Sequence, residues 1–346
     1  MLVVMQTGAT EAQVGAVVSM IEELGYEARV LPGRTRTTVG LVGNDGRVDG
    51  ARFVGLAGVA EVIYVTKPYK QVSREWRPED TVITLPGGLR IGGDEVVVMA
   101  GPCSVESERQ ILEAAHAAAA SGARILRGGA FKPRSSPYSF QGLGLEGLRL
   151  LRKAREETGL LVVTEALDPD AVEVVAETAD VVQLGARNMQ NYSLLRRAGR
   201  CGKPVMLKRG MAATIQEFLL SAEYIIAEGN TQVMLCERGV RGFDPATRNL
   251  FDVAAIPLVK SLSHLPVIAD PSHGTGVRAL VPAMARAAVA AGADGLLVEM
   301  HPDPARALSD GAQSLDPGQL AEMMAEVRRV AEAIGRHVAA PAGARA

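Results

Sequence analysis

From residue 95 onward, short runs rich in valine, isoleucine and leucine alternate with longer stretches whose apolar residues recur every three or four positions. The first pattern is typical of strands buried on both faces, and the second of amphipathic helices. The apolar runs are VVVMAG (96–101), ARILRGG (123–129), LLVVTEA (160–166), DVVQLGA (180–186), PVMLKRG (204–210), QVMLCERG (232–239), PVIADPSH (266–273) and GLLVEMHP (295–302). These strand–helix units predict a (β/α)8 TIM barrel over residues 95–338. A doubly wound open sheet is the alternative, but no GxGxxG sequence follows the first run.

Residues 1–66 show a different order of elements. Strand-like LVVMQ is followed by the amphipathic stretch EAQVGAVVSMIEELG, then by EARVLP, TTVGLVGN, the short helical stretch DGARFVGLAG, and EVIYV. This β-α-β-β-α-β order predicts a small ferredoxin-like α+β domain. Residues 67–94 are expected to form a polar linker and a hairpin that closes the bottom of the barrel. Residues 339–346 are expected to form a flexible tail.

The 346-residue chain has a formal net charge of −2, which argues against a general binder of nucleic acid or anionic membranes. No apolar run approaches the ~18 residues that a membrane span requires. Three cysteines lie far apart in the sequence, which fits a reducing compartment better than a disulfide framework. Because the start of the chain also lacks the pattern of a signal peptide, we expect a cytoplasmic protein.

Charged residues gather where the predicted strands end. The active site of a TIM barrel lies at the C-terminal ends of its strands, so these residues are candidates for binding and catalysis. Arginine and lysine suit phosphate and carboxylate ligands, arginine through its bidentate fork. The cations at this end of the barrel are Arg127, Lys132, Arg134, Arg187, Lys208 and Arg238. Their number predicts a site for anionic ligands.

A second set of residues at the same strand ends suits a divalent metal ion. Cys103, His273, Glu299 and Asp310 would supply a soft sulfur, an imidazole nitrogen and carboxylate oxygens. They are far apart in sequence, so only the barrel fold would bring them together. A buried apolar thiol is the alternative interpretation of Cys103. His301, two residues after Glu299, is a rival ligand.

Several segments together resemble a known family. GPCSVES, LRGGAFKPRSSPYSFQG, QLGARNMQNYSLL, LKRGMAATIQEF, LCERGVRGF, ADPSHGTG and VEMHPDPARALSDGAQSL are similar to the motifs of 3-deoxy-D-arabino-heptulosonate 7-phosphate (DAHP) synthases. The resemblance is to the type I beta branch with an N-terminal ferredoxin-like extension, and it covers essentially the whole chain. It implies condensation of phosphoenolpyruvate with D-erythrose 4-phosphate, the first step of the shikimate pathway. It also implies one divalent metal ion of the Mn, Fe, Co or Zn class.

The resemblance implies a role for each candidate residue. Arg187 and Arg238 would hold the phosphate of phosphoenolpyruvate, Arg127 and Lys208 its carboxylate, Lys132 the aldose carbonyl, and Arg134 with Ser135 the aldose phosphate. Lys132, Lys208, Cys103 and His273 would take part in catalysis, with Lys208 also a proton donor. Glu165, at the end of the third strand, is a candidate either for proton transfer or for pairing with nearby cations.

Two alternative functions remain open. A 3-deoxy-D-manno-octulosonate 8-phosphate (KDO8P) synthase shares the fold and the chemistry but takes arabinose 5-phosphate. That enzyme carries a Lys-Ala-Asn-Arg type of loop where this chain has Lys132-Pro133-Arg134-Ser135, which favours erythrose 4-phosphate. A non-catalytic phosphosugar sensor would lack a metal ligand or a phosphate-binding cation, and none is missing. The resemblance further implies that residues 1–66 form a regulatory domain through which tyrosine or phenylalanine inhibits, with an oligomerisation or stability element as the alternative. We expect the chain to form a homodimer or homotetramer.

Overall fold

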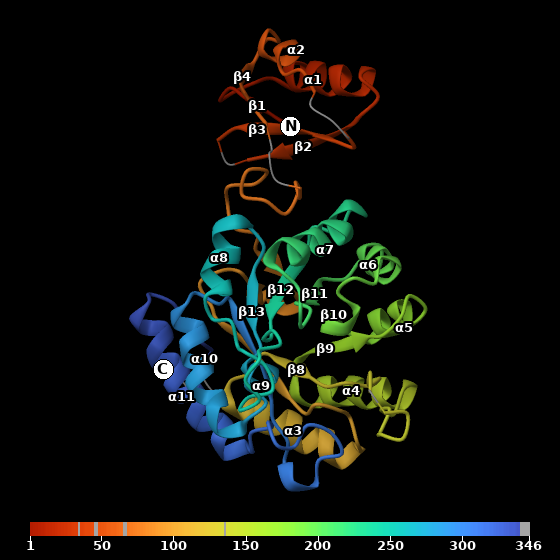
Figure 1. The fold of residues 1–346 in the computed structure, drawn as a ribbon, viewed down its shortest axis with the longest axis vertical. Helices are drawn as coiled ribbons and strands as arrows, with labels where there is room; N and C mark the ends of the chain where they lie inside the picture. The colour runs from red at the N-terminus through yellow and green to blue at the C-terminus, as the bar shows by residue number, and fades with distance from the viewer. Residues whose placement is uncertain (34, 45–47, 65–67, 135, 340–346) are drawn as a thin grey trace. The chain divides into compact units, whose positions relative to one another are not determined.

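The computed structural model describes all residues except 34, 45–47, 65–67, 135 and 340–346. The chain divides into two compact units, Met1–Pro78 and Glu79–Ala346 (Figure 1). The domain boundary expected between residues 66 and 67 lies outside the described residues, as does the expected tail except for its first residue. Within the described part of the chain, no helix has both the length and the apolar character needed to cross a membrane.

The first unit has the predicted ferredoxin-like order. Its elements are β1 (Leu2–Met5), α1 (Glu11–Glu23), β2 (Glu27–Pro32), β3 (Thr37–Val42), α2 (Ala51–Val54) and β4 (Val59–Ile63). The strands form an antiparallel sheet in the order β2-β3-β1-β4. Thr10 begins α1 with a capping box that includes Gln13. Side chains of α1 and α2 pack on one face of the sheet, where Ile21, Val39 and Phe53 are fully buried.

The segment after β4 belongs to this first unit. Because side chains alternate along a strand, Gly40 faces away from the core that holds Val39 and Leu41. Trp76, which is almost completely buried, lies against Gly40 so closely that a Cβ there would come within 1.9 Å of its ring. This contact lies within the compact unit Met1–Pro78, which thus includes part of the segment expected to be a linker.

In the described part of the chain, the second unit is the predicted barrel. Eight parallel strands close in the order β7-β8-β9-β10-β11-β12-β13-β14. They are β7 (Val97–Gly101), β8 (Ile125–Arg127), β9 (Leu161–Ala166), β10 (Val181–Leu184), β11 (Val205–Lys208), β12 (Val233–Glu237), β13 (Val267–Ala269) and β14 (Gly295–Glu299). Each strand lies within one of the apolar runs and is buried along nearly its whole length, as a parallel sheet covered by helices requires.

Helices follow the strands and surround the barrel (Figure 1). They are α3 (Glu108–Ser121), α4 (Leu145–Thr158), α5 (Ala171–Thr178), α6 (Tyr192–Gly199), α7 (Ile215–Ala227), α8 (Ala255–Leu262), α9 (Pro271–Thr275), α10 (Val281–Ala290) and α11 (Pro317–Ala333). Single 3-10 turns occur at η1 (Pro86–Gly88), η2 (Ala186–Asn188), η3 (Arg278–Leu280) and η4 (Pro304–Arg306). Several helices begin at a side-chain cap, among them α3 at Ser107 and α7 at Thr214.

A short hairpin precedes the barrel. Strands β5 (Ile83–Thr84) and β6 (Arg90–Ile91) pair antiparallel around η1. The apolar side chains of the hairpin pack into the same core cluster as residues at the N-terminal ends of the strands, such as Val97 and Ile125. The interior of the barrel is thus filled at its N-terminal end, which leaves the C-terminal ends of the strands for a binding site.

Candidate active site

The C-terminal ends of the strands carry buried charged residues. Arg127 ends β8, Lys208 ends β11, Glu237 ends β12 and Glu299 ends β14, and all of them are buried. Charged groups are seldom buried unless they are paired or serve a function. The partners of each group therefore indicate what this end of the barrel can do.

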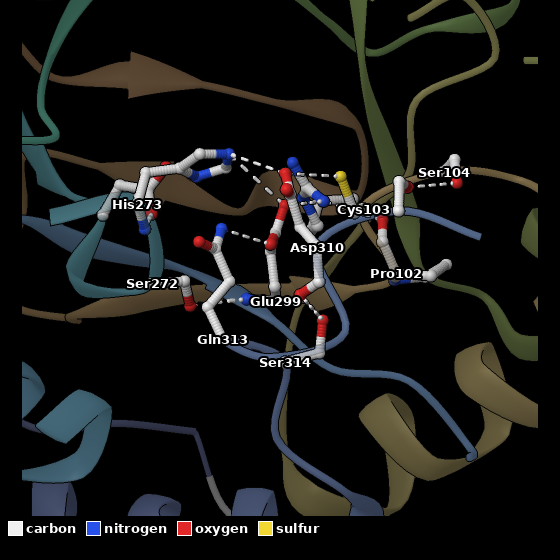
Figure 2. A network of polar contacts seen from close by, with 12 residues as sticks. Pro102, Cys103, Ser104, Ser272, His273, Glu299, Asp310, Gln313 and Ser314 are labelled. Carbon is white, nitrogen blue, oxygen red and sulfur yellow. Dashed lines mark hydrogen bonds and ion pairs between the residues drawn. The ribbon is translucent and has the colours of Figure 1, made fainter. Parts of the chain in front are cut away.

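The four predicted metal ligands converge on one place, which we call the metal-competent cluster (Cys103, His273, Glu299 and Asp310; Figure 2). Ligand atoms of Cys103, Glu299 and Asp310 all lie within 4.8 Å of one another. The Sγ atom of Cys103 is 3.2 Å from Oδ2 of Asp310. Nε2 of His273 is 3.4 Å from Oε1 of Glu299 and 3.9 Å from Oδ2 of Asp310. This combination of sulfur, nitrogen and oxygen donors fits a divalent transition-metal ion.

Asp270 orients the histidine of this cluster. It begins α9, accepting a hydrogen bond from the main-chain N–H of His273 at 2.9 Å, and its Oδ2 lies 2.7 Å from Nδ1 of the same residue. Lys208 Nζ donates to the same oxygen at 2.6 Å. Burial lowers the pKa of His273 and so favours the neutral imidazole. With Nδ1 engaged by a carboxylate, Nε2 is left facing the cluster, an arrangement common among metal-binding histidines.

Glu299 is held by two donors. Arg127 Nη1 donates to its Oε1 at 3.0 Å, and Gln313 Nε2 donates to its Oε2 at 2.6 Å. Burial opposes ionisation of this carboxyl group, but its pKa is lowered by His273, when the imidazole is protonated, and by Arg127. Glu299 is therefore a fixed carboxylate, and Gln313 is a functional neighbour that the sequence did not reveal.

The pKa values of the remaining two members of the cluster, Cys103 and Asp310, are shifted in opposite directions. Burial, with the charge of Glu299 adding to it, raises the pKa of Cys103 to about 12. Burial also opposes the charge of Asp310, but His273 and Arg248 lower its pKa to about 2. Lys132 Nζ donates to the main-chain oxygen of Cys103 at 3.0 Å and lies 3.0 Å from its sulfur. Without a metal ion, the cluster thus holds a protonated thiol beside ionised carboxylates.

A cavity of about 300 Å³ adjoins this cluster, with His273 and Asp310 in its wall. We call the positively charged residues that line it the cationic wall: Lys132, Arg134, Arg187, Lys208, Arg238 and Arg248. Arg187 Nη1 donates to the main-chain oxygen of Pro133 at 3.3 Å, which joins two of the rim loops. Arg248 lies 3.4 Å from Asp310 and was not singled out from the sequence. Arg248 lies on the loop after β12, where the sequence has no strand or helix periodicity that would indicate the direction of its side chain.

Arg238 differs from the other cations of the wall. It is buried, and among the described residues its Nη1 atom has no hydrogen-bond partner. Burial lowers the pKa of this guanidinium. A buried guanidinium nitrogen without a hydrogen-bond partner is costly, so an anion is the ligand that would complete this part of the cavity.

The other predicted residues are distributed around this cavity. Arg127 lies behind the metal-competent cluster, bonded to Glu299 and to the main-chain oxygen of Pro102. Glu165 lines the cavity and accepts a hydrogen bond from Gln183 at 3.0 Å. Ser135 lies outside the described residues. His301 lies 3.3 Å from Glu106 and is not part of the group of ligand atoms within 4.8 Å.

Comparison with known families decides what kind of barrel this is. The sequence profile of the DAHP synthetase I family matches residues 79–336, and that of the DAHP synthase ferredoxin-like domain matches residues 1–67. The chain belongs to the DAHP synthetase I family. It is therefore an aldolase-type enzyme of the DAHP synthase group, and its first 67 residues match the ferredoxin-like domain of DAHP synthase.

Two curated relatives show how far the similarity of this DAHP synthetase family member extends. Phospho-2-dehydro-3-deoxyheptonate aldolase of Thermotoga maritima is 50% identical over 335 residues, which cover 97% of this chain and 99% of that protein. A 2-dehydro-3-deoxyphosphooctonate aldolase of Acidithiobacillus ferrooxidans is 36% identical over 246 residues, or 66% of this chain and 86% of that protein. The heptonate aldolase thus matches both units of the chain.

Solved structures agree with this grouping. The crystal structure of the Thermotoga maritima DAHP synthase has a TM-score of 0.78 and 50% identity, and covers 97% of this chain and 98% of that chain. A truncated form of the enzyme from the same organism has a TM-score of 0.72 at 50% identity, and covers 77% of this chain and 98% of that chain.

Proposed function

We propose that this enzyme condenses phosphoenolpyruvate with D-erythrose 4-phosphate and water to give DAHP and phosphate, the first step of the shikimate pathway. One observation carries the proposal: a single cavity is lined by the cationic wall, in which the buried Arg238 has a nitrogen without a hydrogen-bond partner among the described residues, and by His273 and Asp310 of the metal-competent cluster. Substrates that together carry two phosphates and a carboxylate need such cations. An aldehyde that must be activated needs a Lewis acid, which a metal ion on the cluster would supply.

Phosphoenolpyruvate is assigned to the inner part of the cationic wall. Arg187 and Arg238 bind its phosphate, and the buried Nη1 of Arg238 gains in this way the partner that it lacks. Arg127 and Lys208 bind its carboxylate. Arg127 also has a buried Nε without a hydrogen-bond partner among the described residues, which supports this assignment. Guanidinium groups suit such anions because their donors match two oxygens at once.

The aldose is assigned to the loop after β8. Arg134, half-buried in the wall of the cavity, binds its phosphate together with Ser135. Lys132 binds the aldehyde oxygen, since its ammonium group is fixed beside Cys103 at the inner end of the same loop. This arrangement sets the reacting carbon between the two halves of the cavity.

The reaction forms one carbon–carbon bond and one carbon–oxygen bond, and breaks the carbon–oxygen bond between C2 and the phosphate. C3 of phosphoenolpyruvate attacks the aldehyde carbon, a water oxygen adds at C2, and phosphate leaves with cleavage of its bond to C2. Of the two protons of water, one completes the new hydroxyl group at the former aldehyde carbon and the other leaves with phosphate. Lys208, paired with Asp270, is the proposed proton donor, and Lys132 binds the oxygen that becomes the new hydroxyl group.

One divalent metal ion is proposed on Cys103, His273, Glu299 and Asp310. When bound there, it would supply Lewis acidity to the aldehyde or to water. The protein residues orient this site: Asp270 sets the imidazole of His273, and Arg127 and Gln313 fix the carboxylate of Glu299. The donor set accepts several ions of the Mn, Fe, Co and Zn class.

Residues 1–66 are proposed as a regulatory domain that binds tyrosine or phenylalanine and so inhibits the enzyme. Linkage requires that the inhibitor bind better to a blocked state than to the active one. A chain shortened to residues 79–346 should remain active and ignore both amino acids, while the full chain is inhibited at millimolar levels. Inhibition of the shortened chain, or none of the full chain, would refute the regulatory role.

The assembly is proposed to be a homodimer or homotetramer, which light scattering of the purified chain would measure. The free thiols of Cys103, Cys201 and Cys236 support a cytoplasmic location, where thiols stay reduced.

The deciding experiment measures consumption of phosphoenolpyruvate with erythrose 4-phosphate or arabinose 5-phosphate, before and after treatment with EDTA. We expect activity with erythrose 4-phosphate, its loss after chelation, and its recovery with Mn²⁺ or Co²⁺. Preference for arabinose 5-phosphate would instead identify a KDO8P synthase. Binding of a phosphosugar without turnover would indicate a sensor.

A further inference from the structure

The four members of the metal-competent cluster are anchored very differently. Glu299 is the last residue of β14, and Cys103 and His273 lie just beyond the ends of β7 and β13. Asp310 instead lies far along the loop that connects β14 to α11, with a left-handed φ of 50°. A non-glycine residue keeps such a conformation only when its surroundings hold it there. The position of Asp310 therefore depends on what holds this loop.

Glu106 binds this loop to the one that carries Cys103. Its nearly buried carboxylate accepts a hydrogen bond from the main-chain N–H of Leu308 at 2.9 Å and another from Ser104 Oγ at 3.2 Å. Next to these contacts, Oγ of Ser104 and Oγ of Ser309 lie 2.6 Å apart. The residues just before Asp310 are thus tied to the residues just after Cys103.

His301 supplies the third contact of Glu106. The main-chain N–H of Asp303 donates to Nδ1 of His301 at 3.0 Å, so Nδ1 is an acceptor and the ring proton is on Nε2. Nε2, 3.3 Å from Oε2 of Glu106, then donates to that carboxylate. The histidine that looked like a rival metal ligand instead joins the start of the Asp310 loop to Glu106.

We propose that Glu106 is a positioning residue that sets the metal affinity of the cluster by fixing Asp310 against Cys103, with His301 as its partner. The inference rests on the proposed metal dependence. The distance of 3.2 Å between Cys103 Sγ and Asp310 Oδ2 spans two separate loops. Glu106 lies on the loop that carries Cys103 and accepts hydrogen bonds from both loops. Residues that orient ligands without touching the metal often contribute strongly to affinity.

Titration of the chelator-treated full-length enzyme with Co²⁺ tests this proposal without substrates. Thiolate-to-cobalt absorption reports Cys103, and the visible bands report the coordination geometry. Glu106→Gln places an amide donor opposite the Nε2–H of His301, and we expect it to raise the Co²⁺ dissociation constant about tenfold and to change the visible bands. Glu108→Gln is the matched control, because Glu108 pairs with Lys153 on the surface of α3, and it should leave both unchanged.

The route through Asp310 is tested by a double-mutant cycle. If Glu106 acts by placing Asp310, Glu106→Gln should add nothing to Asp310→Asn, whereas an independent role would multiply the two effects. His301→Gln keeps a hydrogen-bond donor for Glu106 and should bind Co²⁺ better than His301→Ala. This pair of variants tests the same contact if Glu106→Gln folds poorly. Unchanged Co²⁺ affinity in Glu106→Gln and His301→Ala would overturn the proposal. A failure to form DAHP would refute the proposed reaction but not this role.

Discussion

The metal-competent cluster and the cationic wall share one cavity but differ in how their charges are paired. Glu299 has Arg127 and Gln313 as donors, and its neighbour Asp270 has Lys208 and His273. On the cationic wall, Arg238 is buried with a nitrogen that has no partner among the described residues. Because an unpaired polar atom of a buried charge is costly, Arg238 gains more from a bound anion than the paired carboxylates beside it.

The largest expected effect is a difference in folding stability between a variant next to the metal-competent cluster and a variant in the cationic wall. Arg127→Met leaves the buried Glu299 without its cation and should lower the free energy of unfolding by about 3–5 kcal/mol. Arg238→Met removes a cation that has an unpaired nitrogen, so it should cost less than about 1 kcal/mol or even stabilise the enzyme without substrates. Urea unfolding of the metal-free enzyme, followed by circular dichroism, measures both. Equal losses in the two variants would remove the distinction.

The next effect concerns the cluster alone. Cys103→Ser should keep the fold but lower metal affinity and kcat/KM together by more than about a hundredfold, because a hydroxyl replaces a thiolate ligand poorly and even orienting residues reach that loss. Cys201→Ser is the control, since Cys201 lies between α6 and β11, away from the cluster. Full activity of the natural chain after rigorous chelation would refute metal dependence.

A smaller effect separates the two ends of the cationic wall. Arg134→Ala should raise the KM for erythrose 4-phosphate roughly tenfold, the lower end of the range for a charge-assisted hydrogen bond, because Arg134 is only half-buried. The KM for phosphoenolpyruvate should change little. Arg238→Met should show the reverse preference. If both variants weaken both substrates equally, the wall does not divide into two subsites.

The last expected effect is a pH dependence of metal binding. Burial raises the pKa of Cys103 to about 12, so the thiol carries its proton at neutral pH and releases it when it binds metal as thiolate. Burial lowers the pKa of His273, so the imidazole binds without releasing a proton. Metal affinity should therefore rise about tenfold for each pH unit between pH 6.5 and 8.5, the slope for one proton. Co²⁺ titrations at three pH values measure this slope, and a flat response would contradict it.

The fold and the strand-end residues could be predicted because they follow from periodicity. Buried parallel strands show as apolar runs, and the residue that ends such a run is placed at the rim, as with Arg127, Lys208 and Glu299. The position of Asp270 next to His273 could also have been predicted from the sequence. An Asp-Pro pair just before a helical turn is a capping signal, and it lies three residues before His273.

Residues on long loops could not be predicted in this way. Gln313 and Arg248 reach the site from segments without regular periodicity, so nothing in the sequence fixes their direction. His301 was a plausible ligand because it follows Glu299 by two positions, but its hydrogen bonds with Glu106 and Asp303 engage both ring nitrogens. The extent of the first unit depends on the packing of Trp76 against Gly40, a contact between distant segments.

That contact gives the enzyme a built-in optical probe. Trp76 is the single tryptophan of the chain, and it is buried in the first unit, against β3. Its emission should therefore follow the melting of that unit, while ellipticity at 222 nm is dominated by the helices around the barrel. Recording both signals during one denaturation would show whether the two units lose their structure together or in sequence, without any label attached to the protein.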